Sequence, residues 1–426
     1  MVRNLTAKGF PKPQVIASDL TSAGYYLTSD RNKDVGVLSL PSFEPSTPAE
    51  MQAVIQTMLM EMKRDGKTKL IVDLQGNGGG IILNGFDAFR QLFPQTQESM
   101  FARQRMSPAF KAIAQISSDR SANFSATSDP DTINIAENHF NFRFDIDENR
   151  AKFTSFEDKF GPVSLNGDMV TNLQQWNFND SLLTTNETFG AGMTVTGYGS
   201  RTNFTQPFPA SSIVMLYDGA CASTCVLFSE MMRVQGNVKS VVLGGRPTSS
   251  QIQAIGGVKG AQSLGFDGVF NLAQFFLGTQ STTDSSLAAL SNLPQNRSLD
   301  NGINFSDQIL RANVKDGLPA QFVREDADCR VFMTPGMVAN VTEMWEVAAD
   351  VAFRGKACVV GGISQGMVSA REEGVERRSM EEMKAAAADS RAWLEQVQTK
   401  AVLEPVQRAA GWGDVHGKGI PNLRIS

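Results

Sequence analysis

The sequence predicts an α/β fold whose core is built from two separated halves. Short apolar runs typical of buried strands alternate with helical segments in residues 34–93 and again in residues 209–362. In each half one such run ends in a turn of small residues, at 75–80 and at 218–225, and a helix follows directly. The region between the halves, 94–208, is polar and lacks clear periodicity, which predicts a surface insertion or a subdomain.

The elements of the first half follow from apolar spacing and from helix-start signals. Thr47 matches an N-cap, Pro48 the first helical turn and Glu50 the partner of Thr47 in a capping box. Apolar residues between Met51 and Met62 then recur at helical spacing on one face. In chain order we predict a strand at 35–40, a helix from 47 to 66, a strand at 69–74 and a helix at 84–92.

The second half and the two ends of the chain complete the predicted organisation. Residues 1–33 are turn-rich and are interpreted as the remnant of an upstream region. Residues 363–426 are charged and rich in Ala, and 372–407 are expected to form a long exposed helix, either a solvated tail or a contact in a homodimer. The expected strands of the second half are 213–217, 238–243, 320–324 and 329–332, with an apolar helix from 225 to about 234.

The composition argues against several classes of function. The net charge of −5 and the pI near 5.3 argue against nucleic acid or an acidic membrane surface as the partner. No apolar run approaches the roughly 18–20 residues of a membrane-spanning helix. Four cysteines and two scattered histidines argue against a zinc site, and we expect no cofactor.

Sequons and cysteines indicate the secretory pathway. The chain has eight Asn-x-Ser/Thr triplets, and its four cysteines permit two disulfides. Both features are typical of secreted or lumenal proteins. The first residues lack the apolar segment of a signal peptide, so Met1 is expected to be internal to a longer natural chain. The sequon asparagines are Asn4, Asn123, Asn179, Asn186, Asn203, Asn296, Asn304 and Asn340.

Two motifs could carry chemistry, and each lies where a predicted strand ends. In residues 74–80, consecutive glycines allow backbone N–H groups to point into a cleft, where they can stabilise an oxyanion. In residues 217–225, a turn of small residues places Ser223 near a helix N-terminus, which favours developing negative charge. Each motif alone also fits a structural role: the first as a plain turn, the second with Ser223 or Thr224 capping the helix.

Together, the two motifs resemble those of the C-terminal processing (tail-specific) serine peptidases. That family pairs a strand ending in an Asp-Leu/Arg-Gly-Asn-x-Gly-Gly turn with a later strand–turn–helix that carries the nucleophilic serine. The matching segments here are 72–80 (VDLQGNGGG) and 216–225 (LYDGACASTC). The Cys-x-Ser-Thr-Cys form looks closest to a fungal branch similar to the chlamydial protease-like activity factor. The resemblance covers roughly residues 34–93 and 205–340.

The resemblance implies a fold and a set of site residues. The fold would be a ClpP/crotonase-like core of ββα units, and the upstream region could be PDZ-like. The nucleophile would be Ser223, and the oxyanion-hole donors would be the backbone N–H groups of Gly78 or Gly79 and of Thr224. The reaction would be peptide-bond hydrolysis through an acyl-enzyme, with a protein or peptide as substrate.

The general base is where this sequence departs from the family. Bacterial members use a lysine a short way after the serine, and the corresponding position here is Thr248. Lys259, in the sequence GVKG, lies 36 residues after Ser223 and is interpreted as an exposed loop lysine. The chlamydial-type branch uses a histidine upstream of the Gly-rich turn. His139 and His416 both lie downstream of it and are interpreted as surface residues, so the base is expected to be a histidine absent from this sequence.

An acidic residue of the later strands should orient that histidine. Glu325 is the first choice, with Asp328 and Asp307 as alternates, although all three could simply be solvated. The cysteines leave two pairings open. Cys221 and Cys225 could bridge the turn around the serine, or they could pair with the two later cysteines, Cys329 and Cys358. A cysteine nucleophile would need a nearby histidine, and none is evident.

Two other functions remain alternatives at this point. The chain could be an inactive secreted relative that keeps the fold as a binding or scaffold protein, which the absent histidine favours. It could also be a crotonase-type acyl-CoA enzyme, because such enzymes use the same Gly-rich oxyanion site. The second alternative leaves the sequons idle and gives Ser223 no role.

Overall fold

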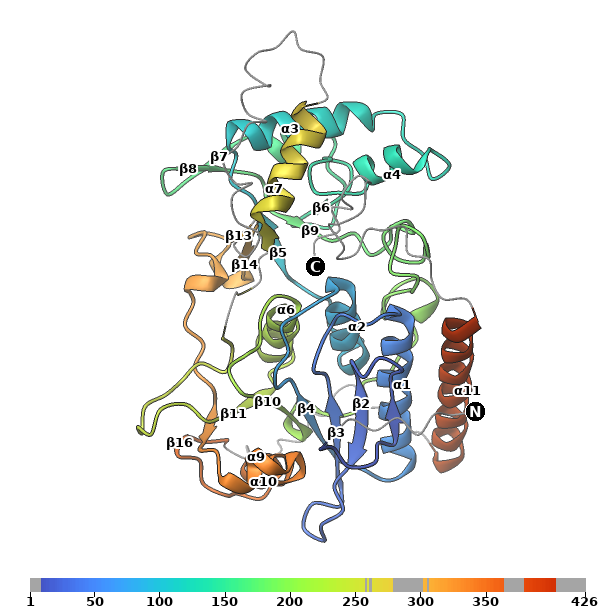
Figure 1. The fold of residues 1–426 in the computed structure, drawn as a ribbon, viewed down its shortest axis with the longest axis vertical. Helices are drawn as coiled ribbons and strands as arrows, with labels where there is room; N and C mark the ends of the chain where they lie inside the picture. Colours follow the sequence, from blue (N-terminus) through green and yellow to red (C-terminus); the bar gives the residue numbers. More distant parts are fainter. Residues whose placement is uncertain are drawn as a thin grey trace. The chain divides into compact units, whose positions relative to one another are not determined.

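The computed structural model describes residues 9–256, 259, 263–278, 302–304, 306–363 and 379–403. The chain forms two compact units (Figure 1). Unit 1 consists of Met1–Glu98, Thr194–Lys259 and Arg324–Val406, and unit 2 consists of Ser99–Met193, Gly260–Val323 and Gln407–Ser426. Most of the polar region predicted at 94–208 therefore lies in unit 2, whereas its two ends lie in unit 1, and residues 260–323, which were expected in the core, belong to unit 2.

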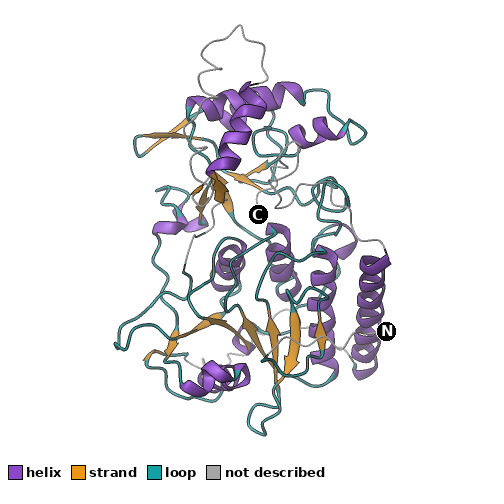
Figure 2. Cartoon of the chain, in the orientation of Figure 1, coloured by secondary structure: helices purple, strands orange, loops and turns teal. Residues whose placement is uncertain are grey.

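Unit 1 is built on an eight-stranded sheet in the order β1-β2-β3-β4-β10-β11-β15-β16. The five central strands, β3 to β15, run parallel, and antiparallel strands extend both edges. Figure 2 shows these strands bordered by helices. The strands are β1 (Val15–Ile16), β2 (Ala23–Tyr26), β3 (Val35–Ser39), β4 (Lys69–Asp73), β10 (Ile213–Tyr217), β11 (Lys239–Leu243), β15 (Cys329–Val331) and β16 (Val360–Gly361).

Helices cover both faces of this sheet, as the predicted α/β class requires. On one face, Met58 and Met62 of α1 pack so closely over Gly24 and Gly36 that neither glycine has room for a Cβ. On the other face, Trp345 of α10 joins the core formed by alternate strand residues. The helices are α1 (Pro48–Arg64), α2 (Ile82–Leu92), α6 (Thr224–Glu230, continued by a π-helical turn at Met231–Gln235), α9 (Pro335–Ala339), α10 (Val341–Phe353) and α11 (Met380–Leu403).

Several local predictions about unit 1 were wrong, each because a tertiary contact replaces a local one. Residues 15–26 are part of the core sheet, since β1 pairs with β2 and β2 pairs with β3. The capping box does not form, because the Thr47 side chain makes no cap hydrogen bond and the Glu50 carboxylate accepts from Ser18 instead. In unit 2, the strand expected at 320–324 is instead a 3-10 turn at Ala320–Phe322.

The C-terminal helix is present, but it is not the exposed tail that the sequence suggested. Arg391 of α11 forms an ion pair with the buried Glu61 of α1, and Gln398 donates to Glu50 at 2.8 Å. Ala387 and Leu394 are buried in the same interface. Because α1 is buried on nearly every side, it needs this second helix as a cover.

Unit 2 has its own small sheets and its own core. A four-stranded sheet has the order β14-β5-β9-β6, and β12-β13 and β7-β8 are separate pairs. Phenylalanines such as Phe110, Phe140 and Phe276 form its core, which the polar composition of this region had hidden. Its elements are β5 (Phe101–Arg103), α3 (Pro108–Arg120), α4 (Pro130–Ala136), β6 (Ile146–Asp147), α5 (Phe156–Phe160), β7 (Val163–Leu165), β8 (Asp168–Val170), β9 (Gln174–Gln175), β12 (Ser263–Gly265), α7 (Phe266–Ala273), β13 (Gly302–Asn304) and β14 (Asp307–Ile309).

Candidate active site

The two predicted turns meet at one edge of the sheet in unit 1. Strands β4 and β10 are parallel neighbours, with Leu216 opposite Asp73, so both turns leave from the same carboxyl-terminal edge. Three hydrogen bonds join the turns: the Gly76 amide to Asp218 Oδ2 (3.0 Å), the Ala222 amide to the Asn77 carbonyl (3.2 Å) and the Thr224 hydroxyl to the Gly80 carbonyl (2.6 Å).

Ser223 has the backbone conformation of a residue held for function. Its φ of 51° and ψ of −123° lie in a region that non-glycine residues rarely adopt. Sharp strand-to-helix turns that present a nucleophilic serine have this strained character. The side chain is half-buried and makes no cap hydrogen bond to α6. The alternative role of Ser223 as a simple helix cap therefore has no support in the structure.

The Gly-rich turn lies directly against the serine. A Cβ on Gly79 would come within 2.6 Å of Ser223 Cβ, so only glycine permits this approach. The Gly79 amide already donates to Asn77 Oδ1 at 2.8 Å, whereas Gly78 is exposed and open space surrounds its Cβ direction. Thr224 is the first residue of α6, where a helix leaves its N–H groups without partners inside the helix. If the Thr224 amide is one donor of an oxyanion hole, the geometry favours the Gly78 amide over the Gly79 amide as the second donor.

Lys259 is not an exposed loop lysine. Its backbone forms a parallel β-bridge with Ser223, and only 5% of the residue is exposed. The ammonium lies 3.3 Å from the Glu325 carboxylate. Desolvation by burial lowers the pKa of Lys259, and the nearby Arg233 lowers it further while Glu230 opposes the shift.

The number of residues between Ser223 and Lys259 did not indicate that the two are neighbours, because the loop before Lys259 is folded around a buried arginine. The Arg330 guanidinium donates to the backbone carbonyls of Gly244 at 3.0 Å and of Thr248 and Ser250 at 2.7 Å, and it also binds that of Arg246. Thr248 is consequently used to hold the loop, and the chain returns to Ser223 only at Lys259. The local sequence GVKG was the signal that could have identified this residue.

Of the three acidic candidates, only Glu325 lies near Lys259. Glu325 is buried and forms ion pairs with Lys259 and Arg233. Asp328 instead holds the start of β11, where it accepts from the Ser240 amide at 2.9 Å. Asp307 belongs to unit 2 and accepts from Gln321 at 2.8 Å.

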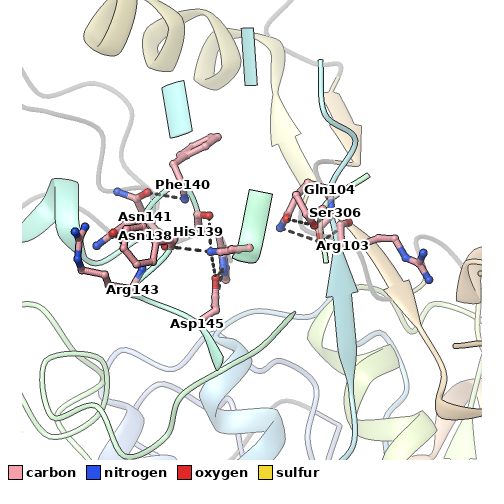
Figure 3. A network of polar contacts seen from close by, with 12 residues as sticks. Arg103, Gln104, Asn138, His139, Phe140, Asn141, Arg143, Asp145 and Ser306 are labelled. Atoms are coloured by element: carbon pink, nitrogen blue, oxygen red, sulfur yellow. Dashed lines mark hydrogen bonds and ion pairs between the residues drawn. The ribbon is translucent and has the colours of Figure 1, made fainter. Parts of the chain in front are cut away.

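The interpretation of His139 as a surface residue was wrong. It is only 6% exposed, and its Nδ1 lies 2.9 Å from Asp145 Oδ2 (Figure 3). Lys159, which is fully buried, donates to the same carboxylate at 2.6 Å and to the His139 carbonyl at 2.8 Å. Burial alone would raise the pKa of Asp145, but His139 and Lys159 hold it below its usual range. This cluster lies within unit 2, and His416 is outside the described residues.

Each disulfide joins two cysteines that follow one another in chain order. Cys221 pairs with Cys225 and Cys329 pairs with Cys358, with Cα–Cα distances of 5.4 and 5.5 Å. This settles the pairing that the sequence left open. Because all four cysteines are bonded, none is available as a thiol nucleophile.

The described part of the chain has neither a metal-binding cluster nor a membrane-spanning helix. Among those residues, no group of three or more His, Cys, Asp or Glu side chains is arranged to hold a metal ion. No helix there is long and apolar enough to cross a membrane.

The chain is similar in sequence to known proteins of one family. Residues 34–255 match the model of peptidase family S41. The chain is 30% identical over 374 residues to the peptidase S41 family protein ustP of Aspergillus flavus, covering 82% of this chain and 75% of that protein. It is 31% identical over 388 residues to phomP1' of Diaporthe leptostromiformis, again covering 82% of this chain but only 56% of the relative.

Similarity to solved structures is weak. A CPAF variant aligns with 80% of this chain and 54% of its own at 11% identity and a TM-score of 0.40. The photosystem II D1 C-terminal processing protease aligns with 54% of this chain and 34% of its own, at 10% identity and a TM-score of 0.23. The family model and the sequence relatives therefore decide the assignment. They confirm the resemblance first found in the two turns: the chain belongs to peptidase family S41.

Proposed function

We propose that this chain is a serine peptidase in which Ser223 is the nucleophile. The observation that carries the proposal is the position of Ser223, which has a strained backbone, lies at the start of a helix and packs against a Gly-rich turn. The amides of that turn and of the helix start could bind the oxygen of a carbonyl group attacked by Ser223. In the proposed reaction Ser223 Oγ attacks the carbonyl carbon of a peptide bond. The amides of Gly78 and Thr224 bind the oxyanion that develops on the carbonyl oxygen. The substrate would accordingly be a protein or peptide.

Lys259 is the best candidate for the general base within the described chain. A lysine can act as a base only when it is neutral, and its lowered pKa increases that fraction near neutral pH. Its ammonium lies 3.3 Å from the Glu325 carboxylate, and its backbone pairs with Ser223, so the lysine is held beside the proposed nucleophile. Catalytic hydrogen bonds often tighten only in the substrate complex, and there the Lys259 amine would accept the proton of Ser223 Oγ.

The proton balance of the reaction is complete with these groups. Lys259 takes the proton of Ser223 Oγ during attack and returns it to the leaving amine. An acyl-enzyme on Ser223 remains. A water molecule then gives a proton to Lys259 and attacks the ester, and Lys259 passes that proton to Ser223 Oγ as it leaves, which releases the carboxylic acid and restores both the serine and the neutral lysine. The competing assignment is a histidine absent from this sequence, as the chlamydial-type branch would require.

The direct test is labelling with a fluorophosphonate probe, which reacts only with an activated serine. We expect one adduct per chain, and peptide mapping should locate it on the peptide that contains Ser223. Heat-unfolded protein is the control, because unfolding separates the serine from its donors. Absence of an adduct on the folded chain would contradict the proposal. It would favour the alternative function, a binding or scaffold relative that keeps this fold without catalysis.

We further propose that the protein is secreted or lumenal and carries N-linked glycans. Five of the described sequon asparagines are exposed, namely Asn123, Asn179, Asn203, Asn304 and Asn340. Asn186 is half-buried, and its side-chain oxygen accepts from the amides of Thr188 and Phe189, each at 2.8 Å. After expression in a eukaryotic secretory host, enzymatic deglycosylation should convert occupied asparagines of the exposed set to Asp, and Asn186 should be occupied least. Unchanged masses at all exposed sites would exclude the proposal.

A further inference from the structure

The nucleophile lies inside a small covalent ring. The Cys221–Cys225 disulfide closes a loop of four residue steps, and Ser223 is its midpoint. The ring also contains Thr224, whose amide is a proposed oxyanion donor. It connects the irregular segment that follows β10 to the first turn of α6, and both cysteines are fully buried.

The backbone within this segment needs restraint. Ser223 has a φ of +51°, which is unusual for any residue other than glycine, and it lies at the centre of the ring. Two backbone hydrogen bonds of the first turn of α6 start from the ring, Cys225 N to Ala222 O (3.1 Å) and Val226 N to Ser223 O (2.9 Å). A strained nucleophile turn persists only when its surroundings over-determine it, and the cross-link is the strongest local restraint available.

The length of the ring argues against global stabilisation as its main effect. The loss of unfolded-chain entropy caused by a disulfide grows with the size of the closed loop. The Cys329–Cys358 bridge has a sequence separation of 29, whereas Cys221–Cys225 has a separation of 4. The longer bridge is therefore expected to contribute the stability. The shorter bridge is expected to restrict the backbone conformation only of the residues that it encloses, and Ser223 is the central one.

We propose that Cys221 and Cys225 are positioning residues: their disulfide holds Ser223 and the Thr224 amide in the geometry needed for attack. This inference rests on the proposed peptidase function. It predicts that activity depends on this cross-link even where the fold does not.

The test compares two double variants of the full chain, Cys221→Ala/Cys225→Ala and the matched control Cys329→Ala/Cys358→Ala. The measurements are the limiting rate and the half-saturating concentration for fluorophosphonate labelling, together with Tm. For the first variant we expect the limiting rate to fall about 100-fold, the cost of a misplaced reacting group, with half-saturation and Tm nearly unchanged. For the control we expect a lower Tm and a wild-type labelling rate well below that Tm.

A single variant separates the cross-link from simple packing. Cys225→Ala breaks the same bond but leaves Cys221 beside Ser229, whose Oγ lies 3.4 Å from Cys221 Sγ. If the bond is what matters, Cys225→Ala alone should lose as much labelling rate as the double variant, because a bond can be lost only once. Wild-type labelling rates in the folded double variant, or losses in Cys221→Ala and Cys225→Ala that add up to the loss in the double variant, would overturn the inference. An unlabelled wild-type chain would instead contradict the peptidase function itself.

Discussion

Replacing Ser223 with Ala is expected to abolish turnover of a protein substrate, with a loss of about 10⁶-fold, because the acyl-enzyme can no longer form. The fold should be unaffected, since the Ser223 side chain makes no cap hydrogen bond that alanine would remove. Hydrolysis of an unfolded protein such as casein, followed by peptide release, measures the activity. Circular dichroism and Tm measure the fold.

Ser223→Gly is the matched control for this first prediction. Glycine adopts a φ of +51° without steric cost, whereas serine in such a region carries about 1–3 kcal/mol of strain. Ser223→Gly should therefore be as inactive as Ser223→Ala, yet its Tm should equal or exceed that of the wild type. A serine retained at the expense of stability indicates function. Unchanged turnover in either variant would show that the nucleophile lies elsewhere.

Replacing Lys259 with Met is expected to lower turnover by about 10³-fold, the usual contribution of a general base. Lys259→Arg is the informative control. Arginine keeps a positive charge for the ion pair with Glu325, but it cannot lose its proton at any working pH. We expect Lys259→Arg to retain the wild-type Tm and to be nearly as inactive as Lys259→Met. Substantial activity in Lys259→Arg would reduce Lys259 to an ion-pair partner and restore the case for a histidine.

The pH dependence of the wild type tests the same assignment without a mutation. Because the base must be neutral, turnover should rise with pH until Lys259 is deprotonated and then level off. Burial lowers the pKa of Lys259 below the ordinary 10.5, so the plateau should begin at a lower pH than a solvated lysine would allow. A rise centred near pH 6.5 would instead be the signature of a histidine base.

Much of the core could be predicted because its signals are local. Strands such as Ile213–Tyr217 are continuous apolar runs, and parallel neighbours place their following turns at one edge of the sheet. That rule alone brings the Gly-rich turn and Ser223 together. The family resemblance could be found as well, because the residues that carry it lie in these two short segments. The helical C-terminal segment was also predictable from its composition, but the surface it covers was not.

Tertiary structure decided the features that depend on contacts between distant residues. His139 is buried because the polar region around it supplies Asp145 and Lys159 as partners, and no local pattern records that arrangement. Residues 15–26 looked like a remnant because a strand of two or four residues carries almost no periodic signal until it pairs with β3.

By itself, then, the sequence determined the α/β core and the family, and it singled out Ser223 as the candidate nucleophile, since each depends on residues close together in the chain. It could not determine which charged groups surround that serine. Lys259 lies beside Ser223 in a structure where Arg330 binds the carbonyls of the loop that precedes Lys259. Glu325, which forms an ion pair with Lys259, lies 66 positions later in the sequence (325 − 259). Spacing along a chain fixes neighbours within a helix or a strand. Across loops, the distance between two side chains is set by what the loops themselves bind.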